Sequence, residues 1–426
     1  MEVSPPAVSQ KWAGRFFTIW TGQALSLFGS ALVQFALIWW LTQKSGSATI
    51  LALASLVGML PQIVIGPFAG ALVDRWNRRL IMIVADGTIA AFSLLLAYLF
   101  ATGVVQIWHV YAIMAVRSIG GAFHFPAMSA STPLMVPKEQ LTRINGLNQA
   151  LQGINTLFAP VVGAALLLIL PTQGVLLIDV GTALLAILPL LFISIPQPVR
   201  HEELKQQETK PSLMQDIREA LAYIRSIPGF TSLIFMALFL NFLLVPTGAL
   251  LPLLVTKFFG KGAIDLGFLE SAFGVGIIAG GILLTIWGGF KKKIVTSVSG
   301  IVGLGLGVML IGLAPANLFL MAVLGNALMG FMIPMANGPI GALMQSIVRP
   351  DMQGRVMSLL NSGATAISPL GLLLAGPIAD RLGLRVWFWV GGILCVFIAM
   401  AAFFVPVIMN LESHHEEAQA IASEAA

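Results

Sequence analysis

The segment Gly70-Ala-Leu-Val-Asp-Arg-Trp-Asn-Arg-Arg-Leu80 separates two apolar runs, residues 48–71 and 80–101. Each run is more than 20 residues long, and a helix of about that length crosses a hydrocarbon core of roughly 30 Å. The segment itself places an aspartate and three arginines within six positions. A short charged connection between two long apolar runs is typical of a loop between membrane-spanning helices. The sequence therefore predicts two membrane crossings here.

The composition of the whole chain extends this prediction. Of the 426 residues, 58% are hydrophobic and only 10% are charged, whereas an ordinary soluble domain is about 25% charged. So few charges cannot cover a water-facing surface, and the net charge of +5 lies on no soluble basic face that would bind nucleic acid. The one cysteine, Cys395, lies in an apolar run, which excludes a disulfide framework and a cysteine zinc cluster. We expect an integral membrane protein.

Twelve apolar runs are predicted as transmembrane helices. They are residues 16–41, 48–71, 80–101, 108–132, 143–170, 174–195, 229–256, 264–288, 294–313, 317–346, 354–378 and 386–409. The polar stretch 196–228 divides them six and six, so the predicted fold is all-α, with two six-helix bundles. The predicted parts are a bundle at 1–195, a linker at 196–228, a bundle at 229–410 and a tail at 411–426.

Two further patterns concern this division. The linker places four apolar residues at helical spacing: Leu213, Ile217, Leu221 and Ile224. This spacing predicts an amphipathic helix on the inner membrane surface, and an ordinary charged linker that happens to be helical is the alternative.

Prolines at matched places in paired spans give weak evidence for a duplicated six-helix unit. These pairs are Pro126 with Pro334 and Pro160 with Pro369.

Lysine and arginine are distributed unequally between alternate loops. Of the 23 basic residues, 17 lie on the side of the membrane that holds both termini and the second, fourth, sixth, eighth and tenth loops. Five lie in loops on the opposite side, and Arg117 lies inside a span. The positive-inside rule then places both termini in the cytoplasm. The first apolar run has no small-residue cleavage pattern after it, so we expect no removable signal peptide.

The segment 70–80 also resembles the signature loop of the major facilitator superfamily, Gly-x-Leu-x-Asp-Arg-x-Gly-Arg-Arg. Every specified position matches except the second glycine, which is Asn77, a residue that tolerates the left-handed backbone conformation. The resemblance implies a cytoplasmic gate, in which the glycine allows close helix approach, the aspartate faces a helix N-terminus, and the arginines take carboxylate or lipid partners. The gate residues would be Gly70, Asp74, Arg75, Arg78 and Arg79.

Arg117 lies about nine residues into its apolar run, near the middle of the bilayer. Such an arginine nearly always faces a protein interior or an aqueous cavity and has a partner. It resembles the arginine in the fourth span of proton-coupled members of the superfamily, and that arginine influences protonation of a nearby acid. The alternative is a structural arginine bound to backbone carbonyls.

Three acids are candidates for the proton carrier, because a buried carboxyl near an arginine can bind a proton on one side of the membrane and release it on the other. Asp179 could meet Arg117, Asp86 could instead belong to the gate, and Glu270 could be an outer-surface gate residue. Each could also be structural. We expect His124 to be a packing or hydrogen-bonding histidine, with a proton or substrate role as the alternative.

Span 5 partly matches the antiporter signature Gly-x8-Gly-x3-Gly-Pro-x2-Gly-Gly. Gly146, Pro160 and Gly163 agree with it, whereas Asn155, Ala159 and Ala164 replace glycines. The two alanines stay small enough for close helix packing, while the asparagine adds a polar group. The match therefore supports an exporter only weakly.

Across nearly its whole length the chain resembles bacterial macrolide-efflux transporters of this superfamily. The resemblance rests on residues 20–26, 117–127, 132–142 and 354–359. It implies a multi-pass protein of the bacterial inner (cell) membrane that exports amphipathic small molecules, macrolides or other drug-like compounds, by proton antiport and alternating access. Lysophospholipid or siderophore transport is the alternative within the superfamily. A membrane-embedded enzyme or receptor is a remote alternative, because no nucleophile, metal cluster or soluble sensor domain is visible.

Polar residues within the spans are the candidates for lining a substrate path. They are Gln34, Asn148, Gln152, Asn241 and Asn337. No phosphate-binding loop and no histidine spacing suited to a metal is present, so we expect no cofactor and no enzymatic activity. The expected partners are a small-molecule substrate, protons and membrane lipids, and two linked bundles predict a monomer.

Overall fold

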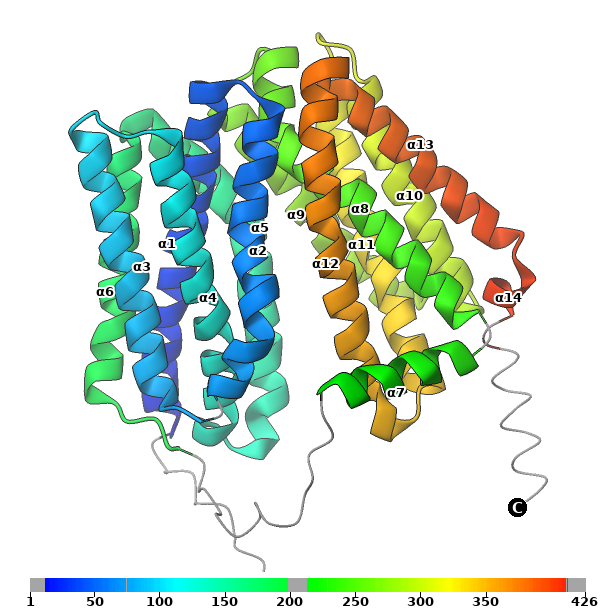
Figure 1. Ribbon diagram of the computed structural model, residues 1–426, viewed down its shortest axis with the longest axis horizontal. Helices are drawn as coiled ribbons and strands as arrows, with labels where there is room; N and C mark the ends of the chain where they lie inside the picture. The colour runs from blue at the N-terminus through cyan, green and yellow to red at the C-terminus, as the bar shows by residue number, and fades with distance from the viewer. Residues whose placement is uncertain (1–11, 74, 198–212, 228, 411, 413–426) are drawn as a thin grey trace, which may run out of the picture. The chain divides into compact units, whose positions relative to one another are not determined.

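The computed structural model describes residues 12–73, 75–197, 213–227, 229–410 and 412 (Figure 1). These residues form helices joined by short connections and contain no strand. The chain divides into two compact units, the first made of residues 1–46 and 53–205 and the second of residues 47–52 and 206–426. The all-helical fold class is therefore as predicted.

The first unit is built from six long helices. They are α1 (Trp12–Ser45), α2 (Ala48–Val73), α3 (Arg78–Ala101), α4 (Ile107–Met135), α5 (Leu141–Ile169) and α6 (Thr172–Phe192), and the first residues of α2 group with the second unit. Helix α1 packs against α5 and α6, and α3 packs against α4 and α6. These contacts bring α1, α3, α4 and α6 around one interior.

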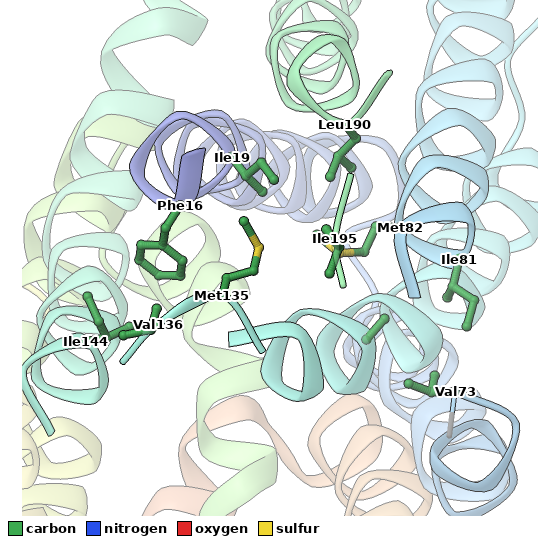
Figure 2. Close-up of a cluster of buried hydrophobic side chains, with 11 residues drawn as sticks. Phe16, Ile19, Val73, Ile81, Met82, Met135, Val136, Ile144, Leu190 and Ile195 are labelled. Atoms are coloured by element: carbon green, nitrogen blue, oxygen red, sulfur yellow. The ribbon is translucent and has the colours of Figure 1, made fainter. Parts of the chain in front are cut away.

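One apolar cluster ties together the helix ends of this unit that lie near the segment 70–80 (Figure 2). Phe16 and Ile19 of α1 lie beside Met135 at the end of α4, and Met82 of α3 lies near Leu190 of α6. All five side chains are at least nine-tenths buried. Burying side chains of this size stabilises a fold by about 1.5–3 kcal/mol each in water. Within a bilayer the gain comes instead from close packing, so the cluster fixes how these helix ends fit together.

The second unit contains α7 (Leu213–Ser226) and six long helices. These are α8 (Phe230–Leu253), α9 (Ala263–Trp287), α10 (Lys293–Leu313), α11 (Phe319–Ile347), α12 (Pro350–Leu382) and α13 (Leu384–Phe403). Glycines let two of them, α9 and α11, pack at backbone contact: a Cβ added at Gly280 of α9 or at Gly330 of α11 would lie 2.0 Å from a carbonyl oxygen of the other helix. Small residues at such contacts are the usual means by which membrane helices associate.

Helix α7 lies within the predicted linker and runs crosswise to α12 (Figure 1). Ala220 and Ile224 of α7 are buried. The Glu219 carboxylate forms an ion pair with Arg355 of α12, with 2.6 Å between Oε2 and Nη1. The Tyr223 hydroxyl accepts a hydrogen bond from the backbone N–H of Arg349. The buried face of α7 is thus turned to protein, while Leu221, expected on the apolar face, is 40% exposed. The rest of the linker, residues 198–212, lies outside the described residues.

Eleven of the twelve long helices in the described part of the chain are long and apolar enough to cross a membrane. The remaining helix, α4, has 29 residues, but Arg117, His124 and several hydroxyl side chains lower its hydropathy. The described residues thus contain a long helix for each of the twelve predicted spans, and length and composition alone identify eleven of them as candidate crossings. The last predicted span was also too long: α13 ends at Phe403, and Pro406, which lacks an N–H, begins the separate turn α14 (Pro406–Met409).

Candidate functional site

Four polar side chains meet inside the first unit in what we call the arginine layer, made of Ser30, Ser93, Arg117 and Asp179. Arg117 of α4 donates through Nη1 to Oδ2 of Asp179 on α6 at 2.5 Å and also to the Ser93 hydroxyl. Ser30 and Ser93 donate to the two carboxylate oxygens at 3.0 and 2.9 Å. Asp179 is 0% exposed. The carboxylate is therefore closed in by an ion pair and two hydroxyl donors.

Three more polar side chains form the histidine layer, made of Gln23, Asp86 and His124. Gln23 Nε2 donates to Asp86 Oδ2 at 3.0 Å, and Gln23 Oε1 lies 2.6 Å from His124 Nε2. The same ring nitrogen is 3.3 Å from Asp86 Oδ1. The three residues are 0%, 3% and 6% exposed. A histidine and a carboxylate are thus held side by side where few charged groups are tolerated.

The two layers follow from one spacing that recurs on three helices. Gln23 and Ser30 on α1, Asp86 and Ser93 on α3, and Arg117 and His124 on α4 are each separated by seven residues. Seven residues are nearly two turns, so each pair shares a helix face with a rise of roughly 10.5 Å between its members. Because α3 and α4 are joined by a short connection and pack together, Asp86 meets His124 and Ser93 meets Arg117.

A cavity of about 220 Å³ opens between the layers. Asp86 and His124 border it from one layer and Arg117 and Ser30 from the other, whereas Asp179 is not among the lining residues. The remaining lining groups include Gln34, predicted as a substrate-path residue, and Gln62 of α2. A space of this size that is bordered by several polar side chains is large enough for several water molecules. It gives Asp86 and His124 a contact surface that Asp179 lacks.

The predicted proton-coupling residues fall into three groups. Arg117 and Asp179 are brought together, as the sequence suggested. Among the described residues the partners of Asp86 are Gln23 on α1 and His124 on α4. Glu270 lies on α9 of the other unit and makes no ion pair within the described residues, while its sequence neighbours Lys261 and Asp265 pair with each other at 3.9 Å.

The predicted gate residues are only partly described. Asp74 lies outside the described residues, and Arg75 is exposed. Arg79 donates to the carbonyls of Leu190 and Leu191 in the last turn of α6, so the partners it has among the described residues are backbone oxygens. A Cβ at Gly70 would meet nothing within 4 Å.

Asn77, the departure from the signature loop, also behaves differently from expectation. It has φ −69° and ψ 110°, an extended conformation, and its side chain accepts the backbone N–H of Leu80 at 3.2 Å. Asn77 is therefore the N-cap of α3, a position at which asparagine is strongly favoured. The left-handed geometry that a glycine would supply is not used.

The span-5 residues lie on α5 with different surroundings. A Cβ at Gly163 would lie 3.1 Å from the Phe35 ring of α1, so this glycine sets the α1–α5 contact, whereas Gly146 is open. Ala159 and Ala164 are buried, in line with their expected packing role. Pro160 lies inside α5 without ending it. The Oδ1 atom of Asn155 is buried without a hydrogen-bond partner in the described part of the chain.

The other substrate-path candidates are scattered. Asn148 accepts the indole N–H of Trp20 at 2.8 Å, and Asn241 donates to the Ala237 carbonyl of its own helix. Gln152 and Asn337 are exposed. Only Gln34 of the five borders the cavity between the layers.

Asp380 lies near the end of α12, and no pattern in the sequence indicates a role for it. Its carboxylate accepts the backbone N–H groups of Ala48 and Thr49 at 2.7 and 3.0 Å and the hydroxyls of Ser47 and Thr49 at 2.8 and 2.7 Å. These groups form the first turn of α2, where four backbone N–H groups have no partner within the helix. Asp380 therefore supplies the N-cap of α2 from a distant part of the sequence.

The fold and the buried ionisable layers define a multi-pass membrane protein with the features of a transporter. The family model for the Major Facilitator Superfamily matches residues 19–297 and 247–424. Macrolide efflux protein A of Streptococcus pyogenes is 36% identical over 401 residues, which cover 94% of this chain and 98% of that protein. The multidrug efflux pump Tap of Mycolicibacterium fortuitum is 26% identical, with coverage of 90% and 94%.

Solved structures agree with this fold. The crystal structure of a POT family transporter in complex with 5-aminolevulinic acid superimposes with a TM-score of 0.70 at 14% identity, covering 93% of this chain and 96% of that one. The chain belongs to the Major Facilitator Superfamily. The resemblance to macrolide-efflux transporters that was noted in the sequence is confirmed.

Proposed function

We propose that this protein exports an amphipathic small molecule, a macrolide or a similar drug-like compound, in exchange for protons. The 36% identity to Macrolide efflux protein A over nearly the whole chain supports the cargo class. The two buried ionisable layers support the proton exchange, and they are the observation that carries it. Ionisable residues inside a membrane protein are costly and mark substrate or proton paths.

The proposal includes the setting of the protein. The excess of lysine and arginine on one set of loops supports cytoplasmic termini, and the bacterial relatives support the bacterial inner membrane. Transport by one copy, through alternating access of the two linked halves, fits a chain that contains both. The signature loop, with Asp74, Arg75, Arg78 and Arg79, is proposed as the cytoplasmic gate. No chemical conversion of the cargo is proposed.

Transport by purified protein in liposomes tests the proposal. Labelled erythromycin is added outside liposomes whose lumen is more acidic than the medium, and uptake is compared with liposomes at equal pH and with liposomes treated with a protonophore. Because an amine-bearing macrolide also accumulates passively in an acidic lumen, protein-free liposomes under the same gradient provide the baseline. We expect uptake above this baseline only with the gradient.

Variants of the arginine layer sharpen this experiment. Arg117→Ala removes the cation that pairs with Asp179, and we expect it to abolish gradient-driven uptake. The matched control is Arg381→Ala, because Arg381 is exposed and lies outside both layers. Uptake by the wild type that equals the protein-free baseline would refute macrolide export by proton exchange.

A lysophospholipid is the second candidate cargo. An apolar groove of about 640 Å³ lies along α3 and α4, lined by Leu80, Val84, Ile119 and Phe123 among others. Its shape and chemistry suit an acyl chain. Transfer of a fluorescent lysophospholipid between leaflets, with no uptake of erythromycin, would favour this candidate. Siderophore transport rests on the family resemblance alone and would be tested by uptake of a ferric siderophore in the same liposomes.

A further inference from the structure

We propose that His124 and Asp86, positioned by Gln23, form the site that binds and releases the exchanged proton, while Arg117 and Asp179 stay charged as a positioning ion pair. This inference rests on the proposed proton exchange and assigns it to one layer. It separates two acids that the sequence left equivalent.

The hydrogen-bond pattern fixes where the hydrogens lie. An ionised carboxylate only accepts hydrogen bonds, so the Gln23 amide turns its NH₂ group toward Asp86 and its oxygen toward His124. At 2.6 Å from that oxygen, His124 Nε2 must carry a hydrogen. In the neutral ring the free lone pair is then on Nδ1. The layer thus presents one base, already oriented, beside one carboxylate.

Proton binding follows from this arrangement. A proton from water in the cavity adds to the Nδ1 lone pair of His124, which becomes an imidazolium whose Nε2–H stays donated to Gln23 Oε1 and whose Nε2 lies 3.3 Å from Asp86 Oδ1. The carboxylate balances the new charge, so the layer changes from a net charge of −1 to zero. Release returns the proton to water and restores the neutral ring. The two groups interact closely, so the proton belongs to the pair and not to one residue.

The arginine layer is built for the opposite behaviour. Asp179 is 0% exposed, does not border the cavity, and accepts from one guanidinium and two hydroxyls. A proton on Asp179 would displace these donors and leave Arg117 as an uncompensated buried cation, which is strongly unfavourable. Asp86, in contrast, borders the cavity and faces a neutral amide and a titratable ring.

The charged groups around His124 come from two helices. Helix α3 contributes Asp86, and α4 contributes Arg117, which borders the same cavity and is paired with Asp179 of α6. Helix α1 contributes the neutral Gln23, and α2 contributes the neutral Gln62. The fixed positive charge of Arg117 is therefore part of the environment in which the pair binds its proton.

Proton release on substrate binding tests this assignment without transport. Erythromycin is added to purified protein in weakly buffered detergent solution containing a pH indicator, and the released protons are measured from pH 5 to 9. We expect release from the wild type, loss of release in His124→Gln and in Asp86→Asn, and retained release in Asp86→Glu. His109→Gln is the matched control, because His109 lies at the start of α4 and touches neither layer.

Two further variants distinguish a proton site from a merely structural one. Gln23→Leu removes no titratable group, so release should persist with a shifted midpoint on the pH axis. Replacing Arg117 by Gln together with Asp179 by Asn removes the ion pair as a unit and should leave release in place. If Asp86→Asn fails to fold, His124→Gln and Asp86→Glu decide the question.

The outcomes separate this inference from the proposed function. Release by the wild type that persists in both His124→Gln and Asp86→Asn overturns the assignment and leaves proton exchange standing. Release that is lost in the Arg117 and Asp179 double variant but kept in His124→Gln overturns it as well, and assigns the proton to the arginine layer. If the wild type neither releases protons nor shows gradient-driven uptake, the proposed function itself is wrong.

Discussion

Replacing Asp179 by Asn should destabilise the protein far more than a single lost hydrogen bond. The Asp179 side chain is 1% exposed and the Arg117 side chain 11%, with 2.5 Å between Nη1 and Oδ2. Asparagine keeps the shape but removes the negative charge, so Arg117 becomes a buried cation that faces hydroxyls and an amide. Removing one partner of a buried pair costs roughly 3–5 kcal/mol.

An exposed ion pair with nearly the same geometry provides the control. Arg355 and Glu219 lie 2.6 Å apart, but their side chains are 36% and 44% exposed. Exposed pairs contribute about 0.2–1 kcal/mol, so Glu219→Gln should change stability little. Adding Arg117→Gln to Asp179→Asn should recover most of the stability that Asp179→Asn loses, since no uncompensated charge remains.

Thermal unfolding of the purified variants in one detergent, followed by tryptophan fluorescence, measures these differences. We expect the largest drop in midpoint for Asp179→Asn, recovery of most of that drop in the double variant, and a small change for Glu219→Gln. Equal midpoints for Asp179→Asn and Glu219→Gln would refute the reasoning, as would a double variant whose loss equals the sum of the two single losses.

Three other changes test the packing and capping described above by the same unfolding measurement. Gly280→Ala should lower the free energy of unfolding by about 1–3 kcal/mol, because its Cβ would lie 2.0 Å from the Phe331 carbonyl oxygen. Gly281→Ala, whose Cβ would meet nothing within 4 Å, should not destabilise the protein. Equal effects of the two changes would contradict the α9–α11 packing. Asp380→Ala should cost about 1 kcal/mol through the lost α2 cap, and Arg381→Ala much less; the reverse order would count against the cap. Arg79→Gln should cost about 1 kcal/mol by freeing the α6 carbonyls, whereas Arg75→Gln, at an exposed position, should be neutral. An Arg75→Gln loss as large as that of Arg79→Gln would argue against this role.

The helices were predictable because a membrane span needs a long apolar run, and such runs are visible in sequence. The boundaries were less so: α1 begins at Trp12, before the predicted start at residue 16, and α12 begins at Pro350, before the predicted start at 354. At both places the helix extends beyond the apolar run, over a segment that contains Arg15 in α1 and Asp351 and Gln353 in α12. Helix α4 was predicted as the apolar run 108–132 between two loops, although Arg117 and His124 lower its hydropathy.

The site was only half predictable. A charge inside an apolar run is conspicuous, so Arg117, Asp179 and Asp86 were identified, but their partners depend on how α3, α4 and α6 pack. His124 was expected to be a packing or hydrogen-bonding residue, which agrees with its contact to Gln23, but a lone histidine on an apolar helix gives no indication of which residues it contacts. The available signal was its spacing of seven from Arg117, which matches Asp86 and Ser93 on α3. The Asp380 cap joins residues more than 300 positions apart, and no local pattern indicates it.

Because the two members of each pair are seven residues apart on one helix, the distance between the layers depends on the number of residues between them as well as on the side chains themselves. One residue inserted between Asp86 and Ser93 would rotate the rest of α3 by about 100°. Asp86 would stay with His124, while Ser93 would leave Arg117. Insertions at the same level of α1 or α4 would uncouple the layers through other pairs. The two layers can thus be disconnected one helix at a time without replacing any of their side chains.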